Sequence, residues 1–519
     1  MSHGHKQRVH TSFDRRDLIS IFLTGILLIL IFPPFPFGLL SVVCLFPFFS
    51  FLNGKSVRQV LRGGYLIGFI WASGTLYWIG WATIPGLAGS LIYVPLQFAF
   101  FAVIQGWMYL RAGRRSLWAA PFLWTGMEYL FSAGPLGFPW NSLANTLTDF
   151  PIMIQYADIT GMYGISFWIV LMNVCIYFLF MNRMRGVKSR RMAVAVFLLA
   201  VLPVIYGFRA KRILADVYHE EDQIQISMIQ GNIDPFAVWT AAFKDSSFSV
   251  YRRLTRQVKK TSPDLIIWPE SASPSYLRKR MMYFVRLSAE VTDIGSPLIT
   301  GAPDYRWTDK GTAEIFNTAF LVQPGSSRLA YYHKMHLVPF SERVPFSENM
   351  PFLYALLDQL NWGVGHYSQG DSVTIFTVYP RHLRRDVPFG VAICFDSVFP
   401  FHVREYVRRG AEFLVIITND GWFGNTSGPH QHAHHAVLRA IETRRWVARC
   451  ANTGISEFVD PFGMIRSKTS YNKEAVLTGY IHLRGNSGTF FVKYGEWFVC
   501  FILTGYIISL LLVSLKKEK

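Results

Sequence analysis

Acidic residues are scarce in this chain. Its 519 residues include 33 Asp and Glu against 51 Lys and Arg, which gives a formal net charge of +18 and an isoelectric point near 9.7. A basic chain can bind nucleic acid, but here the excess is not gathered into one binding face. Fifteen of the net +18 charges lie in short segments that flank the apolar stretches, so we expect no nucleic-acid partner.

Charged residues of either sign are also few. They make up 16% of the chain, against 51% hydrophobic residues, and the mean hydropathy is +0.25. The chain is too apolar for an ordinary soluble protein, yet its second half is too charged for a purely membrane-embedded one. We therefore expect a membrane domain at 1–208, a soluble domain at 209–490, and a last span with a short tail at 491–519.

Eight apolar stretches are predicted to be membrane-spanning helices, although the first two are shorter than the ~20 residues that a bilayer requires. They lie near 18–32, 37–52, 64–84, 87–110, 116–132, 164–182, 192–208 and 497–515. Lys and Arg precede the first stretch and follow the second, fourth, sixth and eighth. Because basic loops stay in the cytoplasm, both termini are predicted to be cytoplasmic and the soluble domain to lie outside.

The five cysteines fall into two groups. Cys44, Cys175 and Cys500 lie in apolar stretches, whereas Cys394 and Cys450 lie in the soluble region. In an oxidising compartment these two could form a disulfide. Their contexts indicate different functions instead, because Cys394 ends a buried-strand pattern and Cys450 ends a basic run.

The soluble region alternates strand and helix patterns, and three strand ends carry reactive groups. Glu270 follows the apolar run 265–268, Lys334 follows 329–333, and Cys394 follows 391–393. This alternation predicts a layered α/β domain with its site at the strand ends. A thiol attacks as the thiolate, so a neighbouring base and cation are what acyl transfer through cysteine requires. The three residues are therefore the predicted catalytic set.

Several longer motifs occur in a fixed order along the chain. They are Gly137-Phe138-Pro139-Trp140, Gly231-Asn232, Trp268-Pro269-Glu270, Lys334-Met335-His336-Leu337-Val338-Pro339-Phe340-Ser341-Glu342, Thr418-Asn419-Asp420-Gly421-Trp422-Phe423-Gly424, Gln431-His432, Arg439-Ala440-Ile441-Glu442 and Asn452-Thr453-Gly454. With these motifs the whole chain resembles the bacterial apolipoprotein N-acyltransferases. That resemblance implies eight spans, with a nitrilase-like (carbon–nitrogen hydrolase) αββα sandwich inserted between the seventh and the eighth.

The resemblance also implies a reaction. A fatty acyl chain would pass from a phospholipid, through a thioester on Cys394, to the α-amino group of the diacylglyceryl-cysteine of an apolipoprotein. Glu270 would be the general base, Lys334 would stabilise the oxyanion, and Glu342 would orient the lysine. We expect ping-pong kinetics, no metal or organic cofactor, a monomer, and a place in the bacterial inner membrane with the catalytic domain on the periplasmic side.

Two further parts of the soluble region contribute candidate site residues. Family members usually have Tyr and then Glu after the nucleophile, whereas this chain has Phe395 and Asp396, which we expect to support the site. Trp239 lies in an apolar loop and matches a tryptophan that, in the family, sits on a mobile arm where the acyl chain enters.

The sequence also allows other hypotheses. A membrane-tethered amidase or nitrilase could use the same three residues on small C–N bonds, and a transporter could carry a regulatory soluble domain. Glu128 is almost the only ionisable side chain within the apolar stretches, which offers little for transport. His430, His432, His434 and His435 suggest zinc, but no carboxylate or cysteine completes a site nearby.

Overall fold

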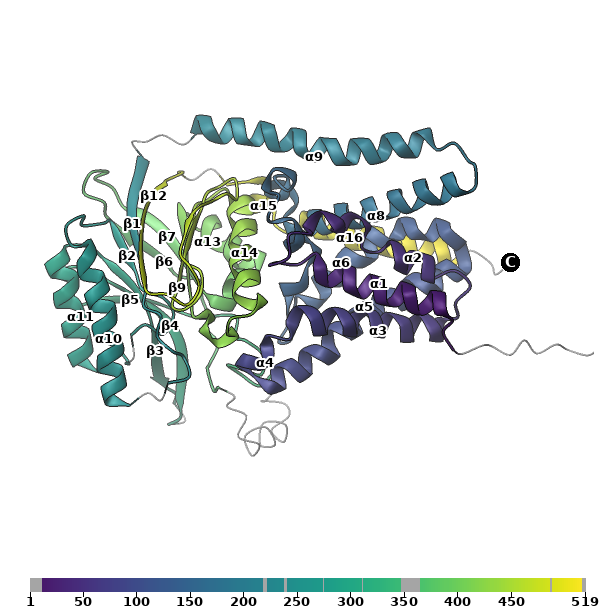
Figure 1. The fold of residues 1–519 in the computed structure, drawn as a ribbon. Helices are drawn as coiled ribbons and strands as arrows, with labels where there is room; N and C mark the ends of the chain where they lie inside the picture. Colours follow the sequence, from purple (N-terminus) through teal and green to yellow (C-terminus); the bar gives the residue numbers. More distant parts are fainter. Residues whose placement is uncertain are drawn as a thin grey trace, which may run out of the picture.

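The computed structural model describes residues 12–217, 222–237, 240–273, 275–309, 311–346, 365–485 and 488–515. Trp239 lies outside these residues. Figure 1 shows a helical bundle beside a domain of two β-sheets, with the last helix returning to the bundle.

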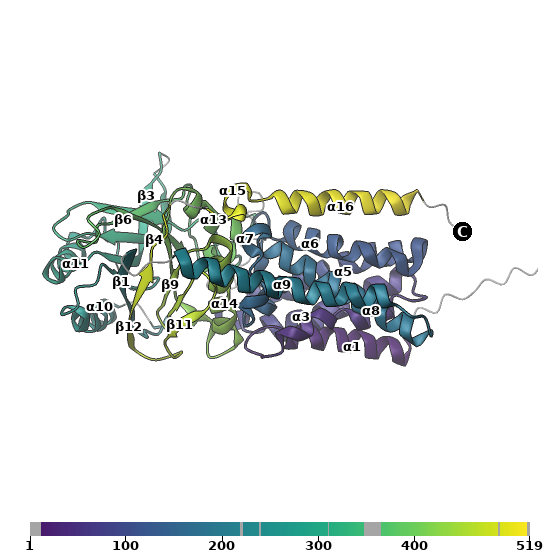
Figure 2. The ribbon, with the colours of Figure 1, turned by 90° about the horizontal axis from the view of Figure 1, so that it is seen from above.

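The bundle contains both ends of the described chain. All eight predicted apolar stretches are largely helical, and four segments are long and apolar enough to cross a membrane: Ile84–Phe131, Met162–Met184, Arg190–Ala215 and Trp497–Ser514. Its helices of eight or more residues are α1 (Arg15–Leu30), α3 (Val57–Leu76), α5 (Ile84–Ala112), α6 (Ala120–Phe131), α8 (Met162–Met184), α9 (Arg190–Val217) and α16 (Trp497–Ser514). The short helices are α2 (Phe46–Phe51), α4 (Ile79–Ala82), α7 (Ala157–Thr160) and α15 (Phe490–Tyr494). Figure 2 shows α16 running alongside α6, in agreement with their packing contacts.

Helix α9 extends beyond the apolar stretch predicted at 192–208. It continues to Val217, so the basic residues Arg209, Lys211 and Arg212 lie on its final turns. Figure 1 shows this helix along the outside of the molecule, reaching from the bundle to the sheets. Many of its apolar side chains are exposed, among them Phe197 and Leu202, as expected for a helix that faces lipid.

The α/β domain contains two six-stranded sheets. Their orders are β12-β1-β2-β3-β4-β5 and β11-β10-β9-β8-β7-β6. The strands are β1 (Gln223–Gln230), β2 (Leu265–Ile267), β3 (Leu298–Trp307), β4 (Ala313–Val322), β5 (Leu329–His333), β6 (Ile375–Val378), β7 (Val387–Ile393), β8 (Phe413–Thr418), β9 (Val447–Ala451), β10 (Glu457–Val459), β11 (Ile465–Lys468) and β12 (Ala475–His482). The strand predicted at 329–333 is confirmed residue for residue.

Helices cover the outer face of each sheet and complete an αββα sandwich. Helices α10 (Ala241–Thr255) and α11 (Met281–Ile294) pack on the first sheet, and α13 (Pro400–Arg408) and α14 (Ser427–Thr443) pack on the second. Strands β1, β2 and β3 run parallel to one another, as do β7, β8 and β9. The carboxyl ends of parallel strands meet at one edge of each sheet, and the two stacked sheets bring the predicted site residues together.

Helix α14 joins the catalytic domain to the bundle. Figure 1 shows it between the sheets and the membrane helices, and nearly all of its side chains are buried. The indole N–H groups of Trp78 and Trp140 both donate to Gln431 Oε1, at 3.1 and 2.9 Å. These bonds fix α14 against segments far away in the sequence.

The basic run that ends at Cys450 is buried, and its last four residues lie in strand β9. Strand β9 pairs with β8 and β10, and both Arg445 and Arg449 are nearly inaccessible to solvent. Arg449 donates to Asp420 at 2.7 Å, which balances the buried charge.

Candidate active site

Cys394 lies at a strained turn. Strand β7 ends at Ile393, and Cys394 begins a 3₁₀ turn with a φ of 49°. A left-handed backbone is uncommon for a residue other than glycine and persists only where the surroundings hold it. Here Ser397 Oγ donates to the Cys394 carbonyl at 2.7 Å, and His432 Nε2 lies 3.2 Å from the same oxygen.

Glu270 and Lys334 meet at the end of the other sheet. Glu270 follows β2, Lys334 follows β5, and the lysine Nζ lies 3.4 Å from Glu270 Oε1 and 2.9 Å from the Glu342 carboxylate. Gly301 allows β3 to approach closely, because a Cβ there would lie 2.6 Å from the Glu270 Cα. Glu270, Lys334 and Cys394 are all buried, and the charges of the first two act on the thiol.

Hydrogen bonding distinguishes the two glutamates. Glu342 accepts from Lys334 and Asn317 on Oε1 and from the Val338 N–H on Oε2, and Lys334 Nζ also lies 2.9 Å from Oε2, so each of its oxygens has two donors. Glu270 accepts from Asn317 and Lys334 on Oε1 and from the Asn419 N–H on Oε2. Glu342 is therefore suited to hold the lysine, whereas Glu270 keeps a position at which it can accept a proton.

Burial dominates the electrostatics of the nucleophile. Desolvation raises the pKa of Cys394 well above its ordinary value, the charge of Glu270 raises it further, and the Lys334 ammonium opposes both. The Lys334 charge lowers the thiol pKa, which is the direction that the sequence predicted, but burial outweighs this effect. At neutral pH the thiol is protonated and needs a base at the moment of attack.

The pKa values of Glu270, the base, and Lys334, the cation, are both raised by their surroundings. Burial raises the pKa of Glu270 above its ordinary value, and Lys334 limits that rise. Burial alone would lower the pKa of Lys334, but the carboxylates of Glu342 and Glu270 outweigh it and hold the pKa well above its ordinary value. The lysine therefore stays charged, while the glutamate is a stronger base than a carboxylate in water.

Asp396 connects the lysine segment to the nucleophile turn. Its carboxylate accepts from the Tyr332 hydroxyl at 2.8 Å, the His336 backbone N–H at 2.7 Å and the Ile393 N–H at 3.2 Å. Tyr332 and His336 lie two residues on either side of Lys334, and Ile393 directly precedes Cys394. Burial opposes its ionisation, but the charges of His402, His336 and Lys334 and a side-chain hydrogen bond from His336 lower the pKa of Asp396 to about 2.

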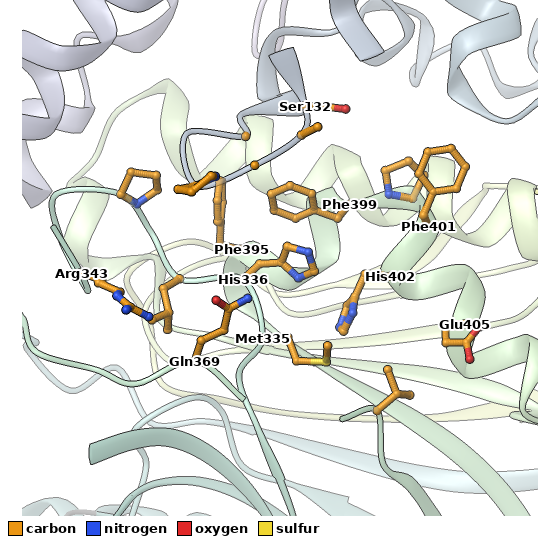
Figure 3. A pocket seen from close by; sticks show the side chains of 18 of the residues that line it. Ser132, Met335, His336, Arg343, Gln369, Phe395, Phe399, Phe401, His402 and Glu405 are labelled. Atoms are coloured by element: carbon orange, nitrogen blue, oxygen red, sulfur yellow. The ribbon is translucent and has the colours of Figure 1, made fainter. Parts of the chain in front are cut away.

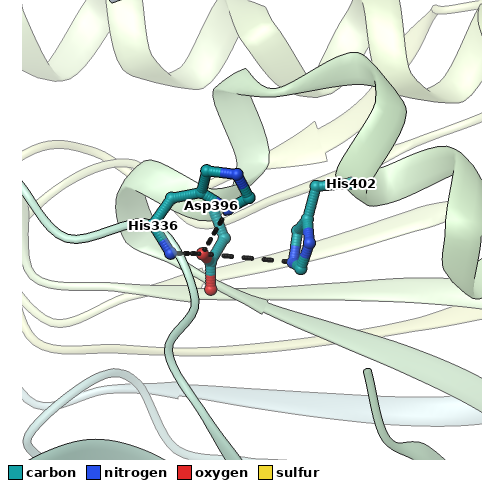
Figure 4. A group of neighbouring side chains, drawn as sticks. All are labelled: His336, Asp396 and His402. Atoms are coloured by element: carbon teal, nitrogen blue, oxygen red, sulfur yellow. Dashed lines mark hydrogen bonds and ion pairs between the residues drawn. The ribbon is translucent and has the colours of Figure 1, made fainter. Parts of the chain in front are cut away.

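His336, Asp396 and His402 also have the composition of a metal site. Their possible ligand atoms all lie within 4.8 Å of one another, and Figure 4 shows the two rings on either side of the carboxylate. The carboxylate oxygen Oδ1 lies 3.2 Å from His336 Nδ1 and 4.0 Å from His402 Nε2. A metal about 2.1 Å from each ligand would require His336 and His402 to move closer together.

The protons around His402 show that the group is a hydrogen-bond network. Tyr332 donates its only hydroxyl proton to Asp396, and Tyr406 donates its own to the Val391 carbonyl at 2.7 Å. His402 Nε2 lies 3.0 Å from both hydroxyl oxygens and must itself be the donor. In this arrangement His402 Nε2 carries a proton, which a metal ion would have to displace before it could bind.

The four histidines near residue 430 do not converge on one point. His432 Nδ1 lies 2.8 Å from the Asp420 carboxylate, whereas His434 Nδ1 lies 2.8 Å from the hydroxyl of Thr148. His432 instead serves the site, because its other ring nitrogen faces the Cys394 carbonyl.

A cavity of about 950 Å³ opens beside the nucleophile turn, between the two domains. Figure 3 shows Phe395, Phe399 and Phe401 lining it from the catalytic domain, opposite Ser132 at the end of α6. Arg343 adds a polar group to the lining of the cavity. The volume is at the upper end of the range for ligand pockets, and the mixed lining is suited to an amphipathic molecule.

Comparison with known proteins identifies the family. Residues 24–175 match the apolipoprotein N-acyltransferase N-terminal domain, and residues 225–485 match the carbon-nitrogen hydrolase domain. An apolipoprotein N-acyltransferase of Geobacter metallireducens is 33% identical, over 98% of this chain and 97% of that protein. The chain belongs to the apolipoprotein N-acyltransferase family.

Other sequence relatives agree with this assignment. Apolipoprotein N-acyltransferases of Chlorobaculum tepidum and Thermotoga maritima are 32% and 27% identical, over 89% and 97% of this chain and 90% and 96% of theirs. Among solved structures, an amidase from Nesterenkonia sp. is 15% identical, covering 52% of this chain and 93% of its own, with a TM-score of 0.36. The assignment rests on the sequence matches.

This member of the apolipoprotein N-acyltransferase family has no disulfide. All five cysteines are free, so the alternative of a Cys394–Cys450 bridge is wrong. Cys450 Sγ lies in the sandwich core, 3.6 and 3.4 Å from the carbonyl oxygens of Ile229 and Ile267.

Glu128 has a local set of partners in the bundle. It accepts from the Trp124 indole, the Ser142 hydroxyl and the Leu143 N–H, at 2.8, 2.8 and 2.9 Å. These bonds fix the segment after α6, and they account for a buried carboxylate without a role in transport.

Phe395, which replaces the family's usual tyrosine, contributes to the domain interface. Its ring lies 5.1 Å from that of Phe399, 5.9 Å from that of Phe138 and 6.4 Å from that of Trp140. The last two belong to the segment after α6, so this residue packs the nucleophile turn against the membrane domain.

Proposed function

We propose that this protein transfers a fatty acyl chain from a membrane phospholipid to the α-amino group of the diacylglyceryl-cysteine of apolipoproteins. The observation that carries the proposal is the buried thiol at a strained strand end, within the electrostatic reach of a paired carboxylate and ammonium. The same domain is joined to helices that can cross a membrane. Both substrates of such a reaction carry acyl chains, which makes this location necessary.

In the first half-reaction Cys394 attacks the ester carbonyl carbon of the phospholipid. Glu270 takes the thiol proton as the C–S bond forms, because the protonated thiol is not itself a good nucleophile. Lys334 stabilises the negative oxygen of the tetrahedral intermediate. The intermediate expels the lysophospholipid alkoxide, Glu270 returns the proton to it, and a thioester remains on Cys394.

In the second half-reaction the lipoprotein amine attacks the thioester. Glu270 accepts the amine proton, Lys334 again stabilises the oxyanion, and Cys394 leaves and recovers a proton. The product is an amide, and the kinetics are ping-pong because the first product leaves before the acceptor reacts. Glu342 holds Lys334 in place through both steps, and Asp396 holds the two segments that carry Lys334 and Cys394.

The architecture supports a finer proposal about location. Eight helical stretches would cross the bacterial inner membrane, with both termini in the cytoplasm and the catalytic domain at 209–490 on the periplasmic side, as the basic loops predict. The cavity of about 950 Å³ between the domains would hold part of a lipid substrate beside the nucleophile turn. The enzyme would act as a monomer.

The two alternatives are less well supported. A small-substrate amidase would need water at the thioester, but only 7% of Cys394, 1% of Lys334 and 6% of Glu270 is exposed to solvent. A transporter would need ionisable groups along a path through the bundle, whereas Glu128 is bound by local donors.

The test is transfer by the purified protein from a phospholipid with a labelled acyl chain to a synthetic diacylglyceryl-cysteinyl peptide. We expect labelled N-acyl peptide from the wild type and none from Cys394→Ser. Release of the label only as free fatty acid, with no acylated peptide, would support the hydrolase alternative and contradict the proposal.

A further inference from the structure

Asn317 contacts Glu270 and Glu342 through its side chain and Lys334 through its backbone. It lies in β4, and only 6% of its surface is exposed. Its side-chain Nδ2 donates to Glu270 Oε1 at 2.7 Å and to Glu342 Oε1 at 3.1 Å. Its backbone carbonyl accepts from the Lys334 N–H at 2.9 Å. Because both side-chain partners are carboxylates and can only accept, the orientation of the amide is unambiguous.

The lone pairs of Glu270 can be counted from these bonds. A carboxylate oxygen has two lone-pair positions. On Oε1 both are used, one by Asn317 and one by Lys334. On Oε2, among the residues that the structure describes, only the Asn419 N–H donates, at 2.9 Å. One position on Oε2 therefore remains for a proton.

Lys334 alone would hold Oε1 weakly. Its contact with that oxygen is 3.4 Å long, and its shorter contact of 2.9 Å is with Glu342. The short Asn317 bond is what fixes the rotation of the Glu270 carboxylate. The Asn317 amide adds no charge to the site. Its two N–H groups lie between two carboxylates that would otherwise repel each other.

We propose that Asn317 is a positioning residue that occupies Glu270 Oε1 and thereby directs the transferred proton to Oε2. The inference rests on the proposed function of Glu270 as general base. The Cys394 proton, and later the amine proton, would bind Oε2 while Asn317 and Lys334 remain on Oε1. The Asn317 bond also stabilises the ionised carboxylate, in opposition to the burial that raises the pKa of Glu270.

The experiment measures single-turnover thioester formation from phospholipid, by intact mass, across a range of pH. Asn317→Ala removes both donors, and Asn317→Asp keeps the shape but places a third carboxylate against the other two. Thr318→Val is the matched control, because it removes the hydrogen bonds of a buried hydroxyl, to His333 and to the Phe316 carbonyl, from the next position of the same strand.

We expect Asn317→Ala to be slower by about a hundredfold at neutral pH, because the base is no longer held in its reactive geometry. Its acidic limb should move to higher pH, because the carboxylate has lost a donor and its pKa rises. Asn317→Asp should be slower still, and Thr318→Val should follow the wild-type profile.

Three results would overturn the inference. One is an Asn317→Asp enzyme with the wild-type rate and profile, since only the shape of the side chain would then matter. Another is a loss in Asn317→Ala that is equal at every pH, and the third is an equal loss in Thr318→Val. If the wild type itself forms no thioester, the proposed function fails, and that result is distinct from all three.

Discussion

Replacement of Asp396 by Asn should destabilise the catalytic domain and misalign its nucleophile. The carboxylate is fully buried and accepts from Tyr332, His336 and Ile393, and its pKa is about 2. An unfolded aspartate has a pKa near 3.9, so ionisation of Asp396 contributes roughly 2–3 kcal/mol to folding at neutral pH. Because the folded pKa is the lower one, this contribution is complete above about pH 4 and is lost as the pH falls towards 2.

The asparagine side chain would keep one acceptor oxygen. Its N–H₂ group, however, would face donors that now bind the Asp396 carboxylate. We expect a loss of about 2–4 kcal/mol, since buried donors would lack partners. For a domain of this size that corresponds to a fall of roughly 5–10 °C in Tm. Thioester formation should slow about tenfold to a hundredfold, because the segments carrying Lys334 and Cys394 would no longer be joined.

The assay combines thermal unfolding of the purified protein with the rates of both half-reactions. Tyr332→Phe removes a single donor and should cost only about 1 kcal/mol. Asp293→Asn, at an exposed ion pair with Lys259, is the control and should change stability by less than about 0.5 kcal/mol. An Asp396→Asn enzyme with wild-type Tm and wild-type rates would refute the reasoning.

Three further predictions concern the chemistry and the donor. Cys394→Ser should abolish thioester formation with the fold intact, whereas Cys450→Ser should leave activity largely unchanged; equal losses in activity assays of the two variants would contradict separate roles. Glu270→Gln and Lys334→Ala should each lower both half-reaction rates severely but combine far from additively, since they act as one unit; a double variant whose rate loss equals the product of the single losses would place one of them outside the site. Trp239→Ala should weaken the use of long-chain phospholipids by roughly ten- to a hundredfold, from about 1.5–3 kcal/mol of apolar burial, relative to a short-chain soluble ester; equal losses in kcat/KM for both donors would instead indicate a role in the fold or the chemistry.

The sequence was sufficient to predict the two-part architecture and the strands that carry the candidate site. Glu270, Lys334 and Cys394 each follow an apolar run that is a strand in the structure. An apolar run is a local pattern that the sequence alone reveals. Because strand ends share an edge of a sheet, the three residues are then expected to lie together. The motifs around them predicted the family, which the sequence comparisons confirm.

Features that depend on tertiary contacts could not be predicted in this way. Asn317 lies inside a strand, and nothing in its local sequence indicates that two glutamates approach it. Arg449 belongs to a basic run, and its local sequence does not indicate that it is buried in strand β9 with Asp420 as its partner. The raised pKa of Cys394 is likewise an effect of burial, since the local sequence shows only a cation and an acid nearby.

The covalent state of Cys394 after incubation with phospholipid alone tests the central claim most directly. Intact-protein and peptide mass spectrometry of the wild type should find one fatty acyl group on Cys394, removable by hydroxylamine as a thioester and lost when a diacylglyceryl-cysteinyl peptide is added. The same treatment of Glu270→Gln should yield little or none. An unmodified Cys394 in an enzyme that still acylates the peptide, or an acyl group attached to another residue, would contradict the account.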